Sequence, residues 1–306
     1  FRVWPGTGRY WCRGCNKQGD EIDYLRERRG LSFQGACSFL GRDPGERKDK
    51  PAPATWTPKE SKTPGELWQS KARAFLDVAI KNLWTPGGER LRQWLKAEKG
   101  LSDAIIKEAM LGYMPIDNYE SREAWGLETA LKENGTEKRL WIPAGLVIPL
   151  ISQNNVIRLR IRRDAPSDGK RYVYVSGSSP APLIIGKDKA AYIIVESELD
   201  AWLLAQEAGD LCGTAALGTA TAKPDKQTHE LLKNAALILI SLDTDETGIN
   251  ASWKFWPETY GGKVKRWPTI HGKDASEAKA NDLDLRTWII AGMFGSEEKF
   301  ERFAIQ

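Results

Sequence analysis

The sequence has no apolar run that approaches the ~20 residues needed to cross a bilayer, so we expect no integral membrane protein. Its 306 residues include only 4 cysteines and 2 histidines. Two cysteines are isolated and two form one Cys-x-x-Cys, which is not a disulfide framework, so a reducing cytoplasm is the expected location. No Gly-x4-Gly-Lys-Ser/Thr loop occurs, so these residues contain no P-loop motor. Because the chain begins with Phe1 and has no leader pattern, we expect a fragment or a processed chain.

The bulk composition is that of an ordinary globular protein. Apolar residues make up 41% and charged residues 28% of the chain, and the length is enough for two or three domains. The net charge of +4 permits a polyanionic partner without requiring one. The 13 tryptophans are scattered without a repeat, which is typical of core and surface-anchor positions.

The pattern along the chain predicts an amino-terminal unit, a linker and a mixed domain. Residues 1–41 form a compact unit with a short strand at Arg9–Cys12, a helix near Asp20–Arg29 and a second helix capped by Ser32. Residues 42–64 are rich in Pro, Lys and Asp, as in a linker. In residues 65–188, helical periodicity precedes alternation typical of antiparallel strands, and Asn154-Asn155 is the predicted first hairpin turn. The predicted helices and strands there are Glu66–Trp84, Glu89–Lys99, Ser102–Met110, Leu146–Ile151, Val156–Ile161 and Tyr172–Val175.

Strands and helices alternate in residues 189–284, which predicts a parallel α/β sheet covered on both faces. Residues 285–306 form a last helical segment. The expected fold class is therefore multidomain, combining α+β and α/β parts.

Four acidic residues follow two of the predicted strands. An apolar run ending at Val195 delivers Glu196, with Asp200 four residues on, and a second run delivers Asp243 and Asp245. Carboxylates at the carboxyl ends of neighbouring parallel strands can gather in one crevice and hold Mg²⁺, which usually acts on phosphates. A single Asp-x-Asp is also compatible with solvated helix caps, but caps do not require a glutamate at another strand end.

Two further elements accompany these acids. Asp274 directly follows the last strand and is either a further metal ligand or the N-cap of a helix at Ala275–Ala280. Gly218 and Thr219 form a turn after a strand, and such a turn can offer backbone amides to a phosphate, although ordinary turns look the same.

These motifs, in this order, resemble the Toprim domain shared by DnaG-type primases, topoisomerases and related nucleases. The phrases are VESELDAWLL, AALGTA, SLDTDETG and GKDASEA. The resemblance implies a Rossmann-like catalytic domain in which Glu196, Asp200, Asp243 and Asp245 are catalytic residues. The family usually has glycine after the glutamate; here Ser197 adds a hydroxymethyl group close to the expected phosphate.

The flanking segments resemble the DnaG-type polymerase domain. Leu91–Pro115 resembles its first helical phrase, and Val156–Arg162 with Lys170-Arg171-Tyr172 resembles its basic strand segment. The resemblance implies that Arg162 and Arg171 contact template or nucleotide, with Arg160 and Lys170 as alternates. Without it, a solvated hairpin face is the simpler interpretation.

Phe1–Asp23 resembles the second half of a primase zinc-binding ribbon. Four ligands are needed for tetrahedral Zn²⁺, and only Cys12 and Cys15 are present here. We expect a partial zinc ribbon, truncated at its amino-terminal side; a degenerate remnant and a redox Cys-x-x-Cys are the alternatives.

Together the resemblances imply a DNA primase that makes short RNA primers, such as the primase half of a phage or mobile-element primase–helicase. Its expected partners are single-stranded DNA, ribonucleoside triphosphates and a replicative helicase, fused or separate, with Mg²⁺ or Mn²⁺ as the catalytic metal. Glu196, Asp243 and Asp245 would hold this metal, with Asp274 as a further ligand. A metal-dependent Toprim nuclease and a non-catalytic DNA-binding adaptor are the alternative functions.

Overall fold

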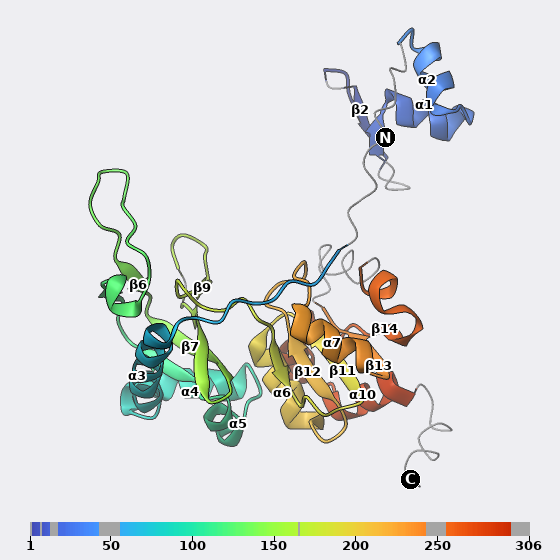
Figure 1. Cartoon of the computed structure of the whole chain (residues 1–306). Coiled ribbons are helices and arrows are strands. Elements are labelled where there is room, and N and C mark those ends of the chain that lie inside the picture. Colours follow the sequence, from blue (N-terminus) through green and yellow to red (C-terminus); the bar gives the residue numbers. More distant parts are fainter. Residues whose placement is uncertain are drawn as a thin grey trace. The chain divides into compact units, whose positions relative to one another are not determined.

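The computed structural model describes residues 2–6, 8–12, 18–42, 56–164, 166–242 and 255–294. Contacts within the chain divide it into two units, Phe1–Thr57 and Pro58–Gln306 (Figure 1). Each unit is described by itself. No helix within the described ranges is long and apolar enough to cross a membrane.

The amino-terminal unit is a small antiparallel sheet followed by two helices. Asp20 accepts hydrogen bonds from the backbone N–H groups of the first helical turn, and Gly30 ends that helix in the left-handed region with φ 66°. The hydroxyl of Ser32 caps the second helix. Both predicted helices are therefore confirmed. The elements are β1 (Arg2–Trp4), β2 (Arg9–Trp11), β3 (Gln18–Asp20), α1 (Glu21–Arg29) and α2 (Phe33–Phe39).

The second unit begins with three helices and an antiparallel sheet of order β4-β7-β8-β9. The long helix α3 (Glu66–Leu83) packs on β4 and β8. Its buried residues Trp68, Ala72 and Leu76 recur every four positions, so one face is apolar and covers the sheet. The remaining elements of this part are α4 (Glu89–Ala97), α5 (Asp103–Glu108), β4 (Gly112–Met114), β5 (Asn118–Glu120), β6 (Leu140–Ile142), β7 (Gly145–Ser152), β8 (Asn155–Arg162) and β9 (Tyr172–Tyr174).

The hairpin between β7 and β8 turns one residue earlier than predicted. Ser152 pairs with Asn155, so the turn residues are Gln153 and Asn154, with φ 48° and 67°. Two successive positive φ values match the twist of a two-residue hairpin turn. The predicted Asn154-Asn155 turn was wrong because the sequence pattern did not indicate that Gln153 would adopt a left-handed conformation.

The α/β part contains a five-stranded sheet of order β10-β12-β11-β13-β14. The predicted parallel pairing is confirmed for β11 with β12 and β13, and for β13 with β14. The short edge strand β10 (Leu183–Ile185) runs antiparallel to β12 and was not predicted. The other elements are β11 (Ala191–Val195), α6 (Glu198–Ala208), β12 (Gly213–Ala216), α7 (Lys226–Asn234), β13 (Leu237–Ile240), β14 (Val264–Arg266), α9 (Ala275–Ala280) and α10 (Leu285–Phe294), and residues 255–260 are also helical.

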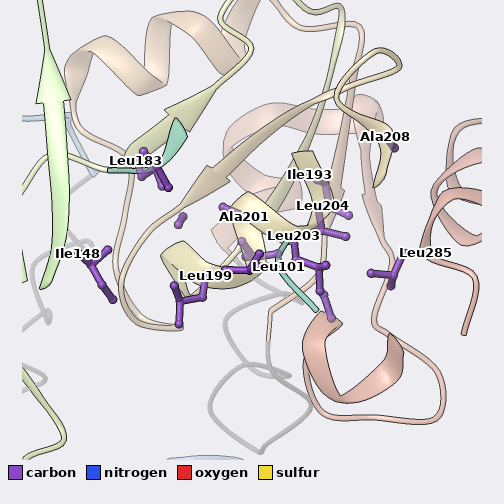
Figure 2. Close-up of a cluster of buried hydrophobic side chains, with 14 of the residues drawn as sticks. Leu101, Ile148, Leu183, Ile193, Leu199, Ala201, Leu203, Leu204, Ala208 and Leu285 are labelled. Atoms are coloured by element: carbon purple, nitrogen blue, oxygen red, sulfur yellow. The ribbon is translucent and has the colours of Figure 1, made fainter. Parts of the chain in front are cut away.

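One apolar cluster joins the two parts of this unit. It contains Leu101 before α5, Ile148 of β7, Ile193 of β11 and the inner face of α6. Figure 2 shows the α6 side chains Leu199 and Leu203 in this cluster, with Ile148 on one side and Leu285 on the other. Because α6 is buried against both sheets, side chains of β8 and of the α6 amino terminus are held in a fixed relation.

Candidate functional site

The site is organised around the residue that follows the central strand β11. Val195 pairs with Ala216 of the neighbouring strand, and beyond this pair the Gly218 N–H donates to the carbonyl of Glu196 at 2.8 Å. Gly218 has φ +91°, and a Cβ there would lie 2.7 Å from the Tyr174 hydroxyl. The predicted Gly218–Thr219 turn therefore lies directly beside Glu196, which is half-buried. A side chain at position 218 would collide with the Tyr174 hydroxyl and so disturb the hydrogen bond between the Gly218 N–H and the Glu196 carbonyl.

Ser197 is the N-cap of α6. Its extended backbone and its hydroxyl, which accepts from the N–H groups of Leu199 and Asp200 at 3.2 and 3.5 Å, begin the helix directly after Glu196. Acidic groups in a first helical turn are favoured by the partial positive charge of the helix amino terminus. The hydroxymethyl group that distinguishes this chain from the family phrase thus has a structural role in ordering the acidic turn.

Asp200, in the first turn of α6, is hydrogen-bonded to the start of α9, the helix that Asp274 caps. Asp200 is 3% exposed and accepts hydrogen bonds from Ser276, from its N–H at 3.1 Å and from its hydroxyl. Burial, and next the charge of Asp274, raise the pKa of Asp200. Asp274 Oδ1 accepts from the Glu277 N–H at 2.8 Å, so the N-cap interpretation of this residue is confirmed. A cap through one oxygen is compatible with a metal ligand through the other.

The donor chemistry of these residues fits a hard divalent cation. The charge of the partly exposed Asp274 repels that of the buried Asp200, and a cation with oxygen ligands offsets such repulsion. Among the described residues, no three His, Cys, Asp or Glu side chains form a metal-binding group. Asp243 and Asp245 lie outside the described residues. The strand before them, β13, pairs with β11 in parallel, and the Ser241 N–H donates to the carbonyl of Ile194 at 2.9 Å.

The predicted basic residues lie in different environments. Arg162 stacks over Trp94, with its guanidinium carbon 4.1 Å from the ring centre, at a cavity of about 360 Å³ also lined by Tyr113. Lys170 and Arg171 are exposed before β9. Arg160, predicted as an alternate groove residue, is only 6% exposed because its guanidinium pairs with the buried Glu198.

Sequence reasoning missed Glu198 and Arg158. Glu198 is 1% exposed and accepts from Arg158 at 3.1 Å and from Arg160. Burial lowers the pKa of Arg158, and the charge of Glu198 opposes this shift. The available signal was the alternation VIRLRIR, which places the arginines of β8 on one face of a strand. In the structure two of these arginines meet Glu198 in the first turn of α6, and this acidic partner offsets the cost of burying them.

In the amino-terminal unit, Cys12 directly follows β2 and is partly exposed. Cys15 lies outside the described residues. The predicted Zn²⁺ site therefore remains a prediction.

The chain resembles known DNA primases in sequence and in fold. No family model matches it. It is 25% identical over 316 residues to the DNA primase of Synechocystis sp., an alignment covering 90% of this chain and 48% of that protein. The chain thus spans about half the length of this relative.

Two solved structures have a similar fold. The zinc-binding and RNA polymerase domains of Aquifex aeolicus primase superpose with a TM-score of 0.55 at 19% identity, covering 94% of this chain and 74% of that one. The RNA polymerase domain of Mycobacterium tuberculosis primase DnaG superposes with a TM-score of 0.52 at 18% identity, covering 72% and 82%.

Proposed function

We propose that this chain, a relative of the DnaG-type DNA primases by sequence and by fold, synthesises short RNA primers on single-stranded DNA from ribonucleoside triphosphates. The observation that carries the proposal is the position of Glu196, beside the Gly218 turn and next to the strand that leads to Asp243 and Asp245. This is the arrangement that a phosphoryl-transfer site of the Toprim kind requires. Such a site could also cut nucleic acid as a nuclease does. We favour primer synthesis because the similar proteins are primases.

Each group of residues has a role in this proposal. Mg²⁺ or Mn²⁺ held by Glu196, Asp243 and Asp245 would stabilise the negative charge of the transferring phosphate. Asp200 and Asp274 orient the acidic cluster through Ser276 and the α9 cap. Amide groups of the turn at Gly218 and Thr219 are available to a nucleotide phosphate.

The DNA template is proposed to follow the basic and aromatic side of the antiparallel sheet. Arg162 with Trp94 offers a charge and a ring face, and the exposed Lys170 and Arg171 add further positive charge. Such contacts neutralise backbone phosphates, so template binding is expected to weaken steeply with salt. In the amino-terminal unit, Cys12 and Cys15 would supply two ligands of a Zn²⁺ site that assists template choice. A replicative helicase, fused or separate, is the proposed partner.

A primer-synthesis assay tests the proposal. The chain is incubated with single-stranded DNA, Mg²⁺ or Mn²⁺ and labelled ribonucleotides, and the products are resolved by size. Short labelled RNA is expected from the wild type and none from the Asp243→Asn/Asp245→Asn variant. Loss of template without added nucleotides would instead identify a nuclease. Template binding without synthesis, unchanged in the double variant, would identify a DNA-binding adaptor.

A further inference from the structure

Three charged side chains form a buried cluster between β8 and the first turn of α6. Arg158 and Arg160 come from β8, and Glu198 from α6. Glu198 accepts from Arg158 through one oxygen and from Arg160 through the other. Exposed fractions are 3% for Arg158, 6% for Arg160 and 1% for Glu198, so the cluster is removed from water.

The two arginines differ in their second contact. Arg158 donates to the carbonyl of Ala181, in the segment before β10. Arg160 donates to the carbonyl of Gly218 at 3.3 Å. Since the Gly218 N–H donates in turn to the Glu196 carbonyl, a single residue, Gly218, links Arg160 to the backbone of Glu196. The guanidinium carbon of Arg158 also lies 5.7 Å from the ring centre of Tyr174, so the difference between the two arginines at this turn is the Arg160 bond to the Gly218 carbonyl.

Aromatic rings fix the direction of the Arg160 side chain. Its guanidinium carbon lies 4.3 Å from the ring centre of Tyr172 and 5.1 Å from that of Tyr174. The Tyr174 hydroxyl also lies 2.7 Å from the place that a Cβ on Gly218 would take, so this ring packs against the turn. Stacked against these rings, a planar guanidinium can reach Glu198 and Gly218 together; a lysine ammonium lacks the fork that spans both.

The cluster is costly for a purely structural feature. It holds two cations and one anion, and among the described residues the Nε atoms of Arg158 and Arg160 are buried without a hydrogen-bond partner. Apolar residues of similar volume commonly stabilise such a position as well or better. The Arg160 bond to the Gly218 carbonyl gives the cluster a connection to the adjacent site that stability alone does not require.

We infer that Arg160 is a positioning residue, which holds the Gly218 turn against Glu196 and thereby sets the cation-binding geometry of the acidic site. Glu198 orients Arg160. Arg158 has a structural role only, because it joins β8 to the segment before β10 through the Ala181 carbonyl. The inference rests on the proposed function, because it concerns the same acidic site.

The matched variants are Arg160→Met and Arg158→Met, because each removes one buried cation and one bond to Glu198. Binding of Mn²⁺ to the protein, measured by the electron paramagnetic resonance signal of the free ion, does not depend on primer synthesis. Arg160→Met is expected to weaken Mn²⁺ binding about tenfold, the loss typical of residues that orient metal ligands. Arg158→Met is expected to bind Mn²⁺ like the wild type although its Tm falls by a similar amount.

Arg160→Lys separates charge from geometry. It is expected to recover most of the Tm, because it still pairs with Glu198, but not the Mn²⁺ affinity. Equal Mn²⁺ affinity in all variants, equal losses in both methionine variants, or no Mn²⁺ binding by the wild type would each overturn the inference. Primer synthesis by the wild type is scored separately: its absence would remove the proposed reaction and leave a difference in Mn²⁺ affinity standing.

Discussion

Two buried carboxylates in the first turn of α6 have opposite surroundings. Glu198 faces β8 and is paired with both Arg158 and Arg160. Asp200, two residues on, accepts from the hydroxyl and N–H of Ser276 in α9, and the charge of Asp274 helps to raise its pKa. The β8 side of the turn thus pairs its carboxylate directly with two guanidinium groups, whereas Asp200 has the repelling charge of Asp274 and the weaker opposing charge of Lys99.

The contrast separates the charge that stabilises the fold from the charge that is available for binding. A buried carboxylate paired with two guanidinium groups needs no external ion. A buried carboxylate beside a second carboxylate is stabilised by a proton or by a divalent cation. We therefore propose that Asp200 belongs to the cation site, whereas Glu198 acts on that site only through Arg160.

Glu198→Gln is expected to have the largest effect on stability. It removes the negative charge from between two buried arginines, and breaking one partner of such a cluster costs about 3–5 kcal/mol of unfolding free energy. Urea unfolding followed by tryptophan fluorescence measures this loss. The control is Glu207→Gln, whose partner Lys279 is partly exposed, with an expected loss under ~1 kcal/mol. Similar losses in the two variants would show that Glu198 is no different from a surface pair.

Asp200→Asn is expected to act in the opposite direction in the absence of metal. The amide still accepts from Ser276 but no longer repels Asp274, so the metal-free variant should be more stable than the wild type. Added Mg²⁺ at a hundredfold its Kd should stabilise the wild type by about 2.7 kcal/mol and the variant by less. Thermal unfolding with and without Mg²⁺ measures both quantities. An equal Mg²⁺ response would assign the cation to other residues.

Local signals in the sequence were sufficient for the elements that position the site. The apolar run that ends at Val195 and the helix Ala275–Ala280 were predicted where the structure has them. These features depend on neighbouring residues, whose capping and periodicity are visible in the sequence.

Contacts between distant segments were not predictable in the same way. β10 is three residues long and its pairing with β12 depends on the tertiary fold. The Arg158–Glu198 pair joins residues 40 apart, and no local pattern indicates which acid would meet which arginine. Asp243 and Asp245 lie outside the described residues, so their predicted roles stand as predictions.

The pH dependence of stability distinguishes the α9 side from the rest of the protein. The folded pKa of Asp200 is raised, so protonation favours the folded state. The stabilisation that the protonated Asp200 carboxyl group gives to the folded state is fully present below the unfolded pKa of ~3.9. It is lost as pH rises through the folded pKa. In metal-free protein, the stability advantage of Asp200→Asn over the wild type, measured by thermal unfolding, should therefore shrink as pH falls through the raised folded pKa of Asp200. An advantage independent of pH would place the ionised Asp200 in a neutralising environment.

Asp210→Asn is expected to have the smallest effect, at the opposite end of the same helix. Asp210 forms two hydrogen bonds of 2.7 Å with Arg286, which hold its pKa at about 2, but both side chains are largely exposed. The stabilisation that the Asp210 carboxylate gives to the folded state is present above its unfolded pKa and is lost as pH falls through about 2.

Salt screens exposed ion pairs strongly and buried ion pairs much less. In ~1 M salt, the small Tm decrease of Asp210→Asn should disappear, whereas the Tm decrease of Glu198→Gln should remain. The reason is that solvent ions reach the Asp210–Arg286 pair but not the buried pairs of Glu198. Equal salt responses of the two variants would contradict this distinction.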